Sequence, residues 1–163
     1  MVKYTKVAIR SKTWGTYLSL DGTGITCYRS EPYRGTVKTT NHVKAWEIFN
    51  LHHNENGTVS FESSAFPGVY LTLNGNGLTA GVINYNGGGY IAAQYGNLGW
   101  EKYYIRRLND STATIYIESA AFPGRFVRAE QALYSQPNVQ AVPQPFEQFE
   151  IVVVSDSFIP SSY

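Results

Sequence analysis

The sequence has one cysteine and no long apolar run, and each scarcity excludes a class of protein. Cys27 alone cannot form an intrachain disulfide, so a fold held together by disulfides is excluded. No segment reaches the roughly 18 apolar residues that a membrane helix needs, so we expect no membrane insertion. The first ten residues, MVKYTKVAIR, lack the continuous apolar stretch of a signal peptide. This predicts a cytoplasmic protein or one secreted by a non-classical route.

The residues that usually carry catalysis or bind metals are also sparse. His52 and His53 are adjacent on an expected strand, so their side chains point to opposite faces, which is poor geometry for a metal. The sequence has no P-loop, no GxGxxG and no Gly-Xaa-Ser-Xaa-Gly motif, and the Gly-rich NYNGGGY lacks the Lys-Ser/Thr pair of a phosphate cradle. We therefore expect no enzyme, no catalytic residue, no metal and no cofactor.

Charge is nearly balanced, with a formal net charge of +1. A protein that binds nucleic acid usually carries a basic excess, so we expect no nucleic-acid partner. The distribution is less even, because residues 1–44 hold eight Lys or Arg against two acidic residues, and residues 45–101 hold no base. Aromatic residues make up 15% of the chain and include 13 Tyr, a composition that favours strands.

One block of residues is repeated three times along the chain. The copies are VAIRSKTWGTYLSLDG from Val7, VSFESSAFPGVYLTLNG from Val59 and IYIESAAFPGRFVRAEQ from Ile115. Apolar residues alternate with period two at the start of each copy, which predicts strands. The Phe-Pro-Gly segments at 66–68 and 122–124 suit a tight turn, because Pro fixes φ and Gly tolerates positive φ.

A second block follows each first block and ends in an aromatic, a glutamate, any residue and an aromatic. Its copies are WEIF, WEKY and FEQF, which begin at Trp46, Trp100 and Phe146. Turn signals such as LDGTG and LNGNG separate the strands. We predict a single all-β domain over residues 1–163, with about twelve strands in three pseudo-symmetric repeats (about 5–56, 57–111 and 112–154) and a tail at 155–163.

These two blocks, and above all VAIRSKTWGTYLSLDG and the closing FEQFEIVVV, resemble the β-trefoil superfamily over essentially the whole chain. The match is most like fascin-type and hisactophilin-type trefoils, and the fold also hosts trefoil lectins. The Gln-Xaa-Trp triplet of ricin-type lectins is absent. The resemblance implies one pseudo-equivalent surface site in each repeat, built from the loops between the blocks. It indicates the fold more strongly than the function, because this fold carries many functions.

The aromatic residues of the second block are expected to form the core. We predict that two sets of three, Trp46, Trp100 and Phe146 and then Phe49, Tyr103 and Phe149, each fill equivalent wedges. The glutamates beside them recur three times, whereas a catalytic acid is usually singular, so we give them no catalytic role. They are expected to accept hydrogen bonds from neighbouring loops.

The loops between the blocks are poor in charge and rich in Tyr, Asn and Gln, a composition that suits a neutral sugar. Amides match hydroxyl donors and acceptors, and an aromatic ring stacks on the apolar C–H face of a sugar. We predict a multivalent lectin for galactose- or GalNAc-type glycans or other neutral sugars. The candidate ligands are Asp21, Asn41 and His42 in repeat one, Asn74, Tyr90, Gln94, Tyr95 and Asn97 in repeat two, and Glu130, Gln140 and Gln144 in repeat three.

Competing interpretations remain at this stage. Asp21 and Asn74 precede glycines, so they could equally be turn caps. The basic first unit and the fascin-like motifs leave an actin-binding module as an alternative. A trefoil protease inhibitor or cytokine-like ligand is a third, with residues 29–37 as the candidate inhibitory loop. Apolar residues in the tail, such as Phe158, suggest a homodimer.

Overall fold

The structure is a computed structural model that describes residues 4–23, 35–79, 89–108, 113–133, 136–140 and 144–155. Cys27, most of the candidate loop at 29–37, residues 80–88, which include Gly87 and Gly88 of NYNGGGY, and the tail from residue 156 lie outside the described residues. The strands are β1 (Thr5–Ser11), β2 (Tyr17–Asp21), β3 (Thr36–Thr40), β4 (Phe49–His53), β5 (Val59–Ser63), β6 (Val69–Asn74), β7 (Tyr90–Tyr95), β8 (Tyr103–Arg107), β9 (Thr114–Ser119), β10 (Phe126–Arg128), β11 (Asn138–Gln140) and β12 (Phe149–Val153). Two short 3-10 helices, η1 (Ala45–Glu47) and η2 (Pro145–Glu147), precede β4 and β12.

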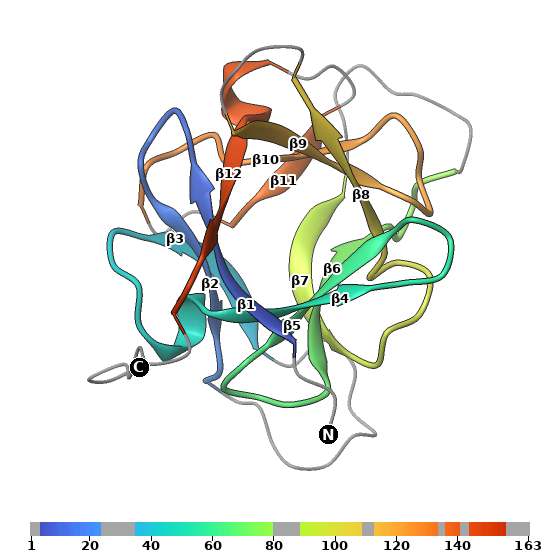
Figure 1. Cartoon of the computed structure of the whole chain (residues 1–163). Helices are drawn as coiled ribbons and strands as arrows, with labels where there is room; N and C mark the ends of the chain where they lie inside the picture. Colours follow the sequence, from blue (N-terminus) through green and yellow to red (C-terminus); the bar gives the residue numbers. More distant parts are fainter. Residues whose placement is uncertain are drawn as a thin grey trace.

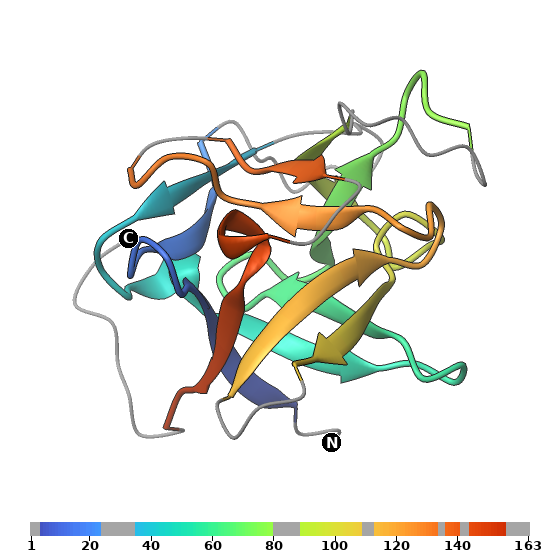
Figure 2. The same ribbon diagram turned by 90° about the horizontal axis from the view of Figure 1, so that it is seen from above.

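The strands form a closed ring that carries three hairpins. Antiparallel pairings join β1 to β4, β4 to β5, β5 to β8, β8 to β9, β9 to β12 and β12 back to β1. The hairpins β2–β3, β6–β7 and β10–β11 are spaced around this ring (Figure 1). Figure 2 shows the hairpin strands lying on one side of the ring strands. The expected all-β class and the twelve strands are confirmed in the described part of the chain.

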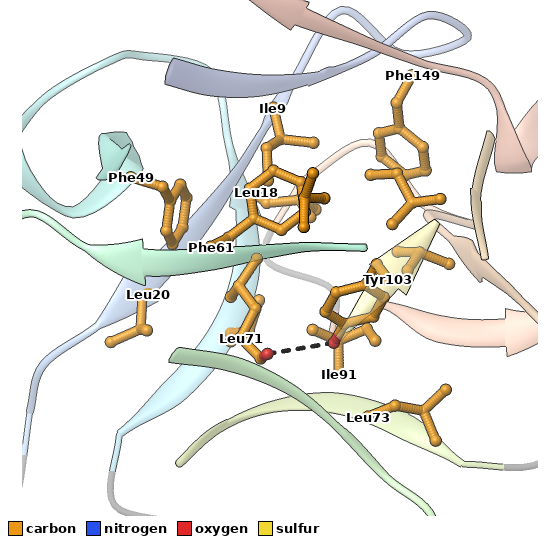
Figure 3. Close-up of a cluster of buried hydrophobic side chains, with 14 of the residues drawn as sticks. Ile9, Leu18, Leu20, Phe49, Phe61, Leu71, Leu73, Ile91, Tyr103 and Phe149 are labelled. Carbon is orange, nitrogen blue, oxygen red and sulfur yellow. Dashed lines mark hydrogen bonds between the residues drawn. The ribbon is translucent and has the colours of Figure 1, made fainter. Parts of the chain in front are cut away.

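Alternation along the strands builds the core. In β5, Val59, Phe61 and Ser63 point inward, and the equivalent residues of β1 and β9 do the same. Phe49, Tyr103 and Phe149 are at most 1% exposed, so the predicted second set of core aromatics is confirmed. The hydroxyl of Tyr103 donates a hydrogen bond of 3.2 Å to the carbonyl oxygen of Leu71 (Figure 3). This bond satisfies the one polar group that the core aromatics carry.

The prediction for the other aromatic set is wrong, because Trp46, Trp100 and Phe146 are half-buried rather than central. Each packs against an aromatic residue from the first turn of the next repeat. The ring centroids are 6.4 Å apart for Trp46 and Phe66, 5.7 Å for Trp100 and Phe122, and 5.4 Å for Phe146 and Trp14. These three pairs, which we call the seam, join each repeat to the next. They explain why the Phe-Pro-Gly turn occurs twice in the sequence.

The same turns are fixed by a repeated hydrogen bond. The hydroxyl oxygens of Ser11, Ser63 and Ser119 each accept the backbone N–H three residues later, at 3.0–3.2 Å. The turn glycines Gly68 and Gly124 both have φ of 87°, as the sequence predicted. Because the serine hydrogen bond recurs in each repeat, the turn places an aromatic side chain at the equivalent position every time.

Glu62 links this turn to the barrel and makes stability depend on pH. It is surrounded by His52 (2.9 Å), the Gly68 N–H (2.7 Å) and the Asn50 amide (3.3 Å). Burial raises the pKa of Glu62, but these hydrogen bonds outweigh it and hold the pKa below its ordinary value of 4.5. The unfolded chain therefore binds more protons in this range, and the stabilisation is lost as pH falls below about 4.5.

We expect Glu62→Gln to flatten the acid side of the stability profile. The variant should be less stable than the wild type at pH 7, and the difference should shrink as pH falls from about 5 to 3, since the carboxylate contribution disappears there. Urea unfolding at several pH values measures this difference, with the exposed Glu55→Gln as the control. An unchanged difference at pH 3 and pH 7 would contradict the assignment.

Candidate functional site

The second repeat holds a surface cavity of about 300 Å³ beside hairpin β6–β7. Its lining residues come from β6, from β7 and from the loop that leads into β8; they are Thr72, Gln94, Leu98, Gly99, Trp100 and Glu101. In the hairpin register Thr72 pairs with Ala92 and Tyr70 with Gln94, so Thr72 and Gln94 lie on the same face of the sheet. The cavity therefore lies where two strands and one loop of a single repeat meet.

The base of the cavity is a buried carboxylate. Glu101 is 2% exposed, and its two oxygens accept hydrogen bonds from the Leu98 N–H (2.8 Å) and the Thr72 hydroxyl (2.6 Å). Thr72 is itself 0% exposed, so this bond fixes its hydroxyl beneath the surface of the cavity. Lys102 holds the loop from outside by donating to the carbonyl oxygens of Asn97 and Leu98. The expected role of the glutamate as an acceptor from loop groups is confirmed at Leu98, and the second donor, Thr72, lies on strand β6.

The walls of the cavity are apolar and neutral. Trp100 is half-buried and is braced by Phe122, while its carbonyl oxygen accepts the Leu73 N–H at 3.0 Å. Leu98 is 65% exposed at the opening. Gln94 brings a carboxamide to the lining, and the lining contains no Lys or Arg. An indole, an amide and a hydroxyl around a small depression can hold a polar, uncharged ligand that has an apolar face.

The structure separates the five candidates of the second repeat. Gln94 lines the cavity. Asn74 and Tyr90 face each other across the hairpin, and the Asn74 amide donates to the Tyr90 hydroxyl at 2.6 Å. Tyr95 packs against the hydrophobic core. The carboxamide of Asn97 is used within the barrel, because it accepts from Ser60 (2.7 Å) and donates to Asn54 (3.1 Å).

The candidates of the first repeat make local contacts. Asp21 accepts the Thr23 N–H (2.9 Å) and pairs with Lys38 (3.0 Å), so it acts as a turn cap, as Asn74 does toward Asn76. Asn41 is exposed just after β3. His42 lies with Nε2 3.4 Å from Oε1 of buried Glu47. The first repeat thus brings His42, and not Asp21, to the residue that corresponds to Glu101.

The candidates of the third repeat lie around Arg128. Glu130 follows β10 and accepts a hydrogen bond of 2.7 Å from the guanidinium of Arg128. Gln144 precedes η2, and its N–H donates to Glu147 at 2.9 Å. Gln140 ends β11, where its backbone pairs with Phe126. Hence Glu130 is a direct partner of Arg128, and Gln144 bonds to a second partner, Glu147.

Sequence reasoning missed Thr72, Leu98, Trp100 and Glu101. Trp100 and Glu101 belong to the repeated second block, whose aromatics we interpreted as packing and whose glutamates as hydrogen-bond acceptors. The available signal was the position that differs between otherwise matching copies: Ser19, Thr72 and Arg128 occupy the same place in the three first blocks. A residue that varies where its neighbours repeat is a candidate for setting the chemistry of a site.

Other features of the described residues point elsewhere. A second cavity of about 330 Å³ opens at the barrel end, lined by Leu51, His53, Val59, Ile105, Arg107, Ala113, Thr114, Ile115 and Ile151. Among the residues that the structure describes, no group of three His, Cys, Asp or Glu could hold a metal ion. No helix in the same part of the chain has the length and hydropathy to cross a membrane.

Comparison with solved structures identifies the fold as a β-trefoil. A designed protein with three-fold symmetry, ThreeFoil, matches with a TM-score of 0.70 at 12% identity over 91% of this chain and 99% of its own. The ricin B-like lectin of Macrolepiota procera, solved in complex with lactose, matches with a TM-score of 0.67 at 11% identity over 94% of this chain and 99% of that chain.

A mosquitocidal holotoxin also matches, with a TM-score of 0.71 at 13% identity over 95% of this chain. This chain spans only 18% of the holotoxin's length. No protein-family model and no curated protein sequence matches the chain. The comparisons therefore show that the chain has a β-trefoil fold.

Proposed function

We propose that the protein is a non-enzymatic lectin that binds a neutral sugar in the cavity of the second repeat. The observation that carries this proposal is the lining of that cavity, in which Gln94, Thr72 and Trp100 surround about 300 Å³ without a cation. A sugar ring offers hydroxyls to the amide of Gln94 and an apolar face to the indole of Trp100, while buried Thr72 forms part of the floor. Phosphate or carboxylate ligands would instead need Arg or Lys at this place.

The solved trefoils support this proposal by their ligands. The Macrolepiota procera structure contains lactose, a neutral sugar, in a protein of the same fold. Galactose- or GalNAc-type glycans are therefore the first ligands to test, with glucose-type sugars beside them. A single shallow site gives weak binding, so presentation on a dense glycan surface would increase the observed avidity.

We expect Leu98→Arg to abolish sugar binding without unfolding the protein. Leu98 is 65% exposed, and its backbone N–H, which holds Glu101, remains in the variant. A guanidinium at the opening would block the cavity, so the affinity should fall at least tenfold. Calorimetric titration with lactose, N-acetylgalactosamine and glucose measures this loss, after a glycan array has ranked the sugars.

Val153→Arg is the matched control, because Val153 is a similarly exposed apolar residue, 70% accessible, at the end of β12. It should bind sugar like the wild type. Equal binding by Leu98→Arg and the wild type would refute the site. A wild type that binds no neutral sugar at millimolar concentration, on the array or in the calorimeter, would refute the lectin proposal.

The structure gives less support to the actin-binding alternative than to the lectin proposal. It depends on a basic surface in the first repeat, and two of those bases are neutralised. Arg10 pairs with Glu150 at 3.2 Å, and Lys38 pairs with Asp21 at 3.0 Å. Screened surface charges of this kind attract an acidic filament less strongly.

A further inference from the structure

One position in each hairpin carries a side chain of a different size in each repeat. Ser19 on β2, Thr72 on β6 and Arg128 at the end of β10 each lie between two buried apolar residues. The equivalence is also visible in hydrogen bonds. The residue after Thr72 donates to the carbonyl oxygen of Trp100 at 3.0 Å, and the residue after Arg128 donates to that of Phe146 at 3.0 Å. Thr72 lines the cavity of the second repeat.

Arg128 occupies the corresponding space in the third repeat. Its guanidinium carbon lies 5.2 Å from the centroid of the Phe146 ring. Its Nε lies 3.5 Å from Oε1 of Glu147, and its Nη1 lies 2.7 Å from Oε2 of Glu130. Phe146 and Glu147 correspond to Trp100 and Glu101, the wall and base of the cavity in the second repeat. The Arg128 side chain therefore lies where a ligand of the second repeat would lie.

We propose that Arg128 closes the sugar site of the third repeat, so that this repeat does not bind the sugar that the second repeat takes. This inference rests on the proposed lectin function and identifies the residue that makes the repeats unequal. Arg128 is not a receptor for an anionic sugar, because Glu130 and Glu147 already surround its guanidinium. An incoming carboxylate or sulfate would meet both of these acids.

Replacement of Arg128 by threonine should leave a folded chain with an open site. Oε1 of buried Glu147 has no hydrogen-bond partner in the described structure. A threonine at 128 can donate to this oxygen, as Thr72 donates to Glu101 at 2.6 Å. Burial raises the pKa of Glu147, and loss of the Arg128 charge raises it further. A neutral carboxyl group can still accept the threonine hydroxyl, so the base of the cavity keeps its hydrogen bonds.

The decisive test uses Leu98→Arg as a background in which the second repeat is blocked. Adding Arg128→Thr to this background should restore binding of the sugar that the wild type prefers, to within about tenfold of the wild-type affinity. In the otherwise wild-type chain, Arg128→Thr should raise the calorimetric stoichiometry by one site per chain. If Arg128 had only a structural role, its replacement would not change the number of sugar molecules bound per chain.

The reciprocal change, Thr72→Arg, should close the second repeat and reduce binding at least tenfold, with the circular dichroism spectrum used to confirm that the variant is folded. If the wild type binds sugar but Arg128→Thr adds no site and restores no binding, the inference about Arg128 is wrong and the lectin proposal survives. Suppose that the Leu98→Arg/Arg128→Thr variant is folded but binds no sugar. A crystal structure in which its third-repeat cavity is open would then show that removing Arg128 is not enough to create a site. If the wild type binds no sugar, both proposals fall together.

Discussion

Phe149→Ala is expected to lower the free energy of unfolding by about 3–5 kcal/mol, because it deletes a ring from a core position that is 0% exposed. A domain of this size has roughly 5–15 kcal/mol in total, so the variant should be close to unfolding at 37 °C. Urea unfolding followed by tryptophan fluorescence measures the loss. Phe146→Ala provides the contrast, because Phe146 is half-buried at the seam, and its loss should be clearly smaller. Equal losses at both positions would contradict the distinction between core and seam.

Gly75→Ala is expected to destabilise the protein by about 1–3 kcal/mol or more through overpacking. Gly75 is buried, and a Cβ at this position would overlap the ring of Phe122, which is wedged between Gly75 and Trp100. Thermal and urea unfolding measure the effect. Gly99→Ala is the control, since a Cβ there meets nothing within 4 Å, and it should change stability little.

A double variant separates steric overlap from other causes. Phe122→Leu shortens the side chain that the new methyl group would meet, so Gly75→Ala should cost less in that background than in the wild type. Additive losses would mean that the two residues do not contact each other as described. Gly22 and Phe66 make the equivalent contact one repeat earlier, so the same pair of experiments can be repeated there.

The fold could be predicted from the sequence because its signals are repeated. The serine, the turn glycine and the second core aromatic occur three times, so an error in one copy is corrected by the other two. Burial was harder to assign. Trp46 and Phe49 are both aromatic and three residues apart, yet Trp46 lies on a 3-10 helix at the rim and Phe49 on a barrel strand. The short helix breaks the period-two pattern from which both were judged to be core.

The candidate site was harder to predict because polar residues in loops often form hydrogen bonds within the protein rather than with a ligand. Asn97 lies in a polar loop segment that the sequence suggests is exposed, yet its carboxamide is hydrogen-bonded to Asn54 and Ser60. Sequence alone cannot show such pairings, since the partners lie far apart along the chain. Gln94 lines the cavity because strand alternation places it on the same face as Thr72, and its role as a sugar ligand stays a prediction.

The difference between repeats follows the same logic. Threefold symmetry of the backbone does not require threefold symmetry of function, since one side chain can fill one site. Arg128 is that side chain in the third repeat, where it contacts Phe146 and two acids. If the proposed sugar binding holds, the number of sites depends on the side chain at the position of Thr72 in each repeat and not on the number of repeats alone.

The central claim is that a neutral sugar binds between Gln94, Thr72 and Trp100. An NMR titration of the ¹⁵N-labelled protein with lactose and with glucose tests it most directly, because every backbone amide reports separately. We predict saturable shifts at the amides of Leu98, Gly99 and Trp100 and at the Trp100 indole N–H, with the amides of Phe146 and Glu147 unchanged. Unchanged spectra at saturating sugar, or shifts confined to residues outside the second repeat, would contradict the account.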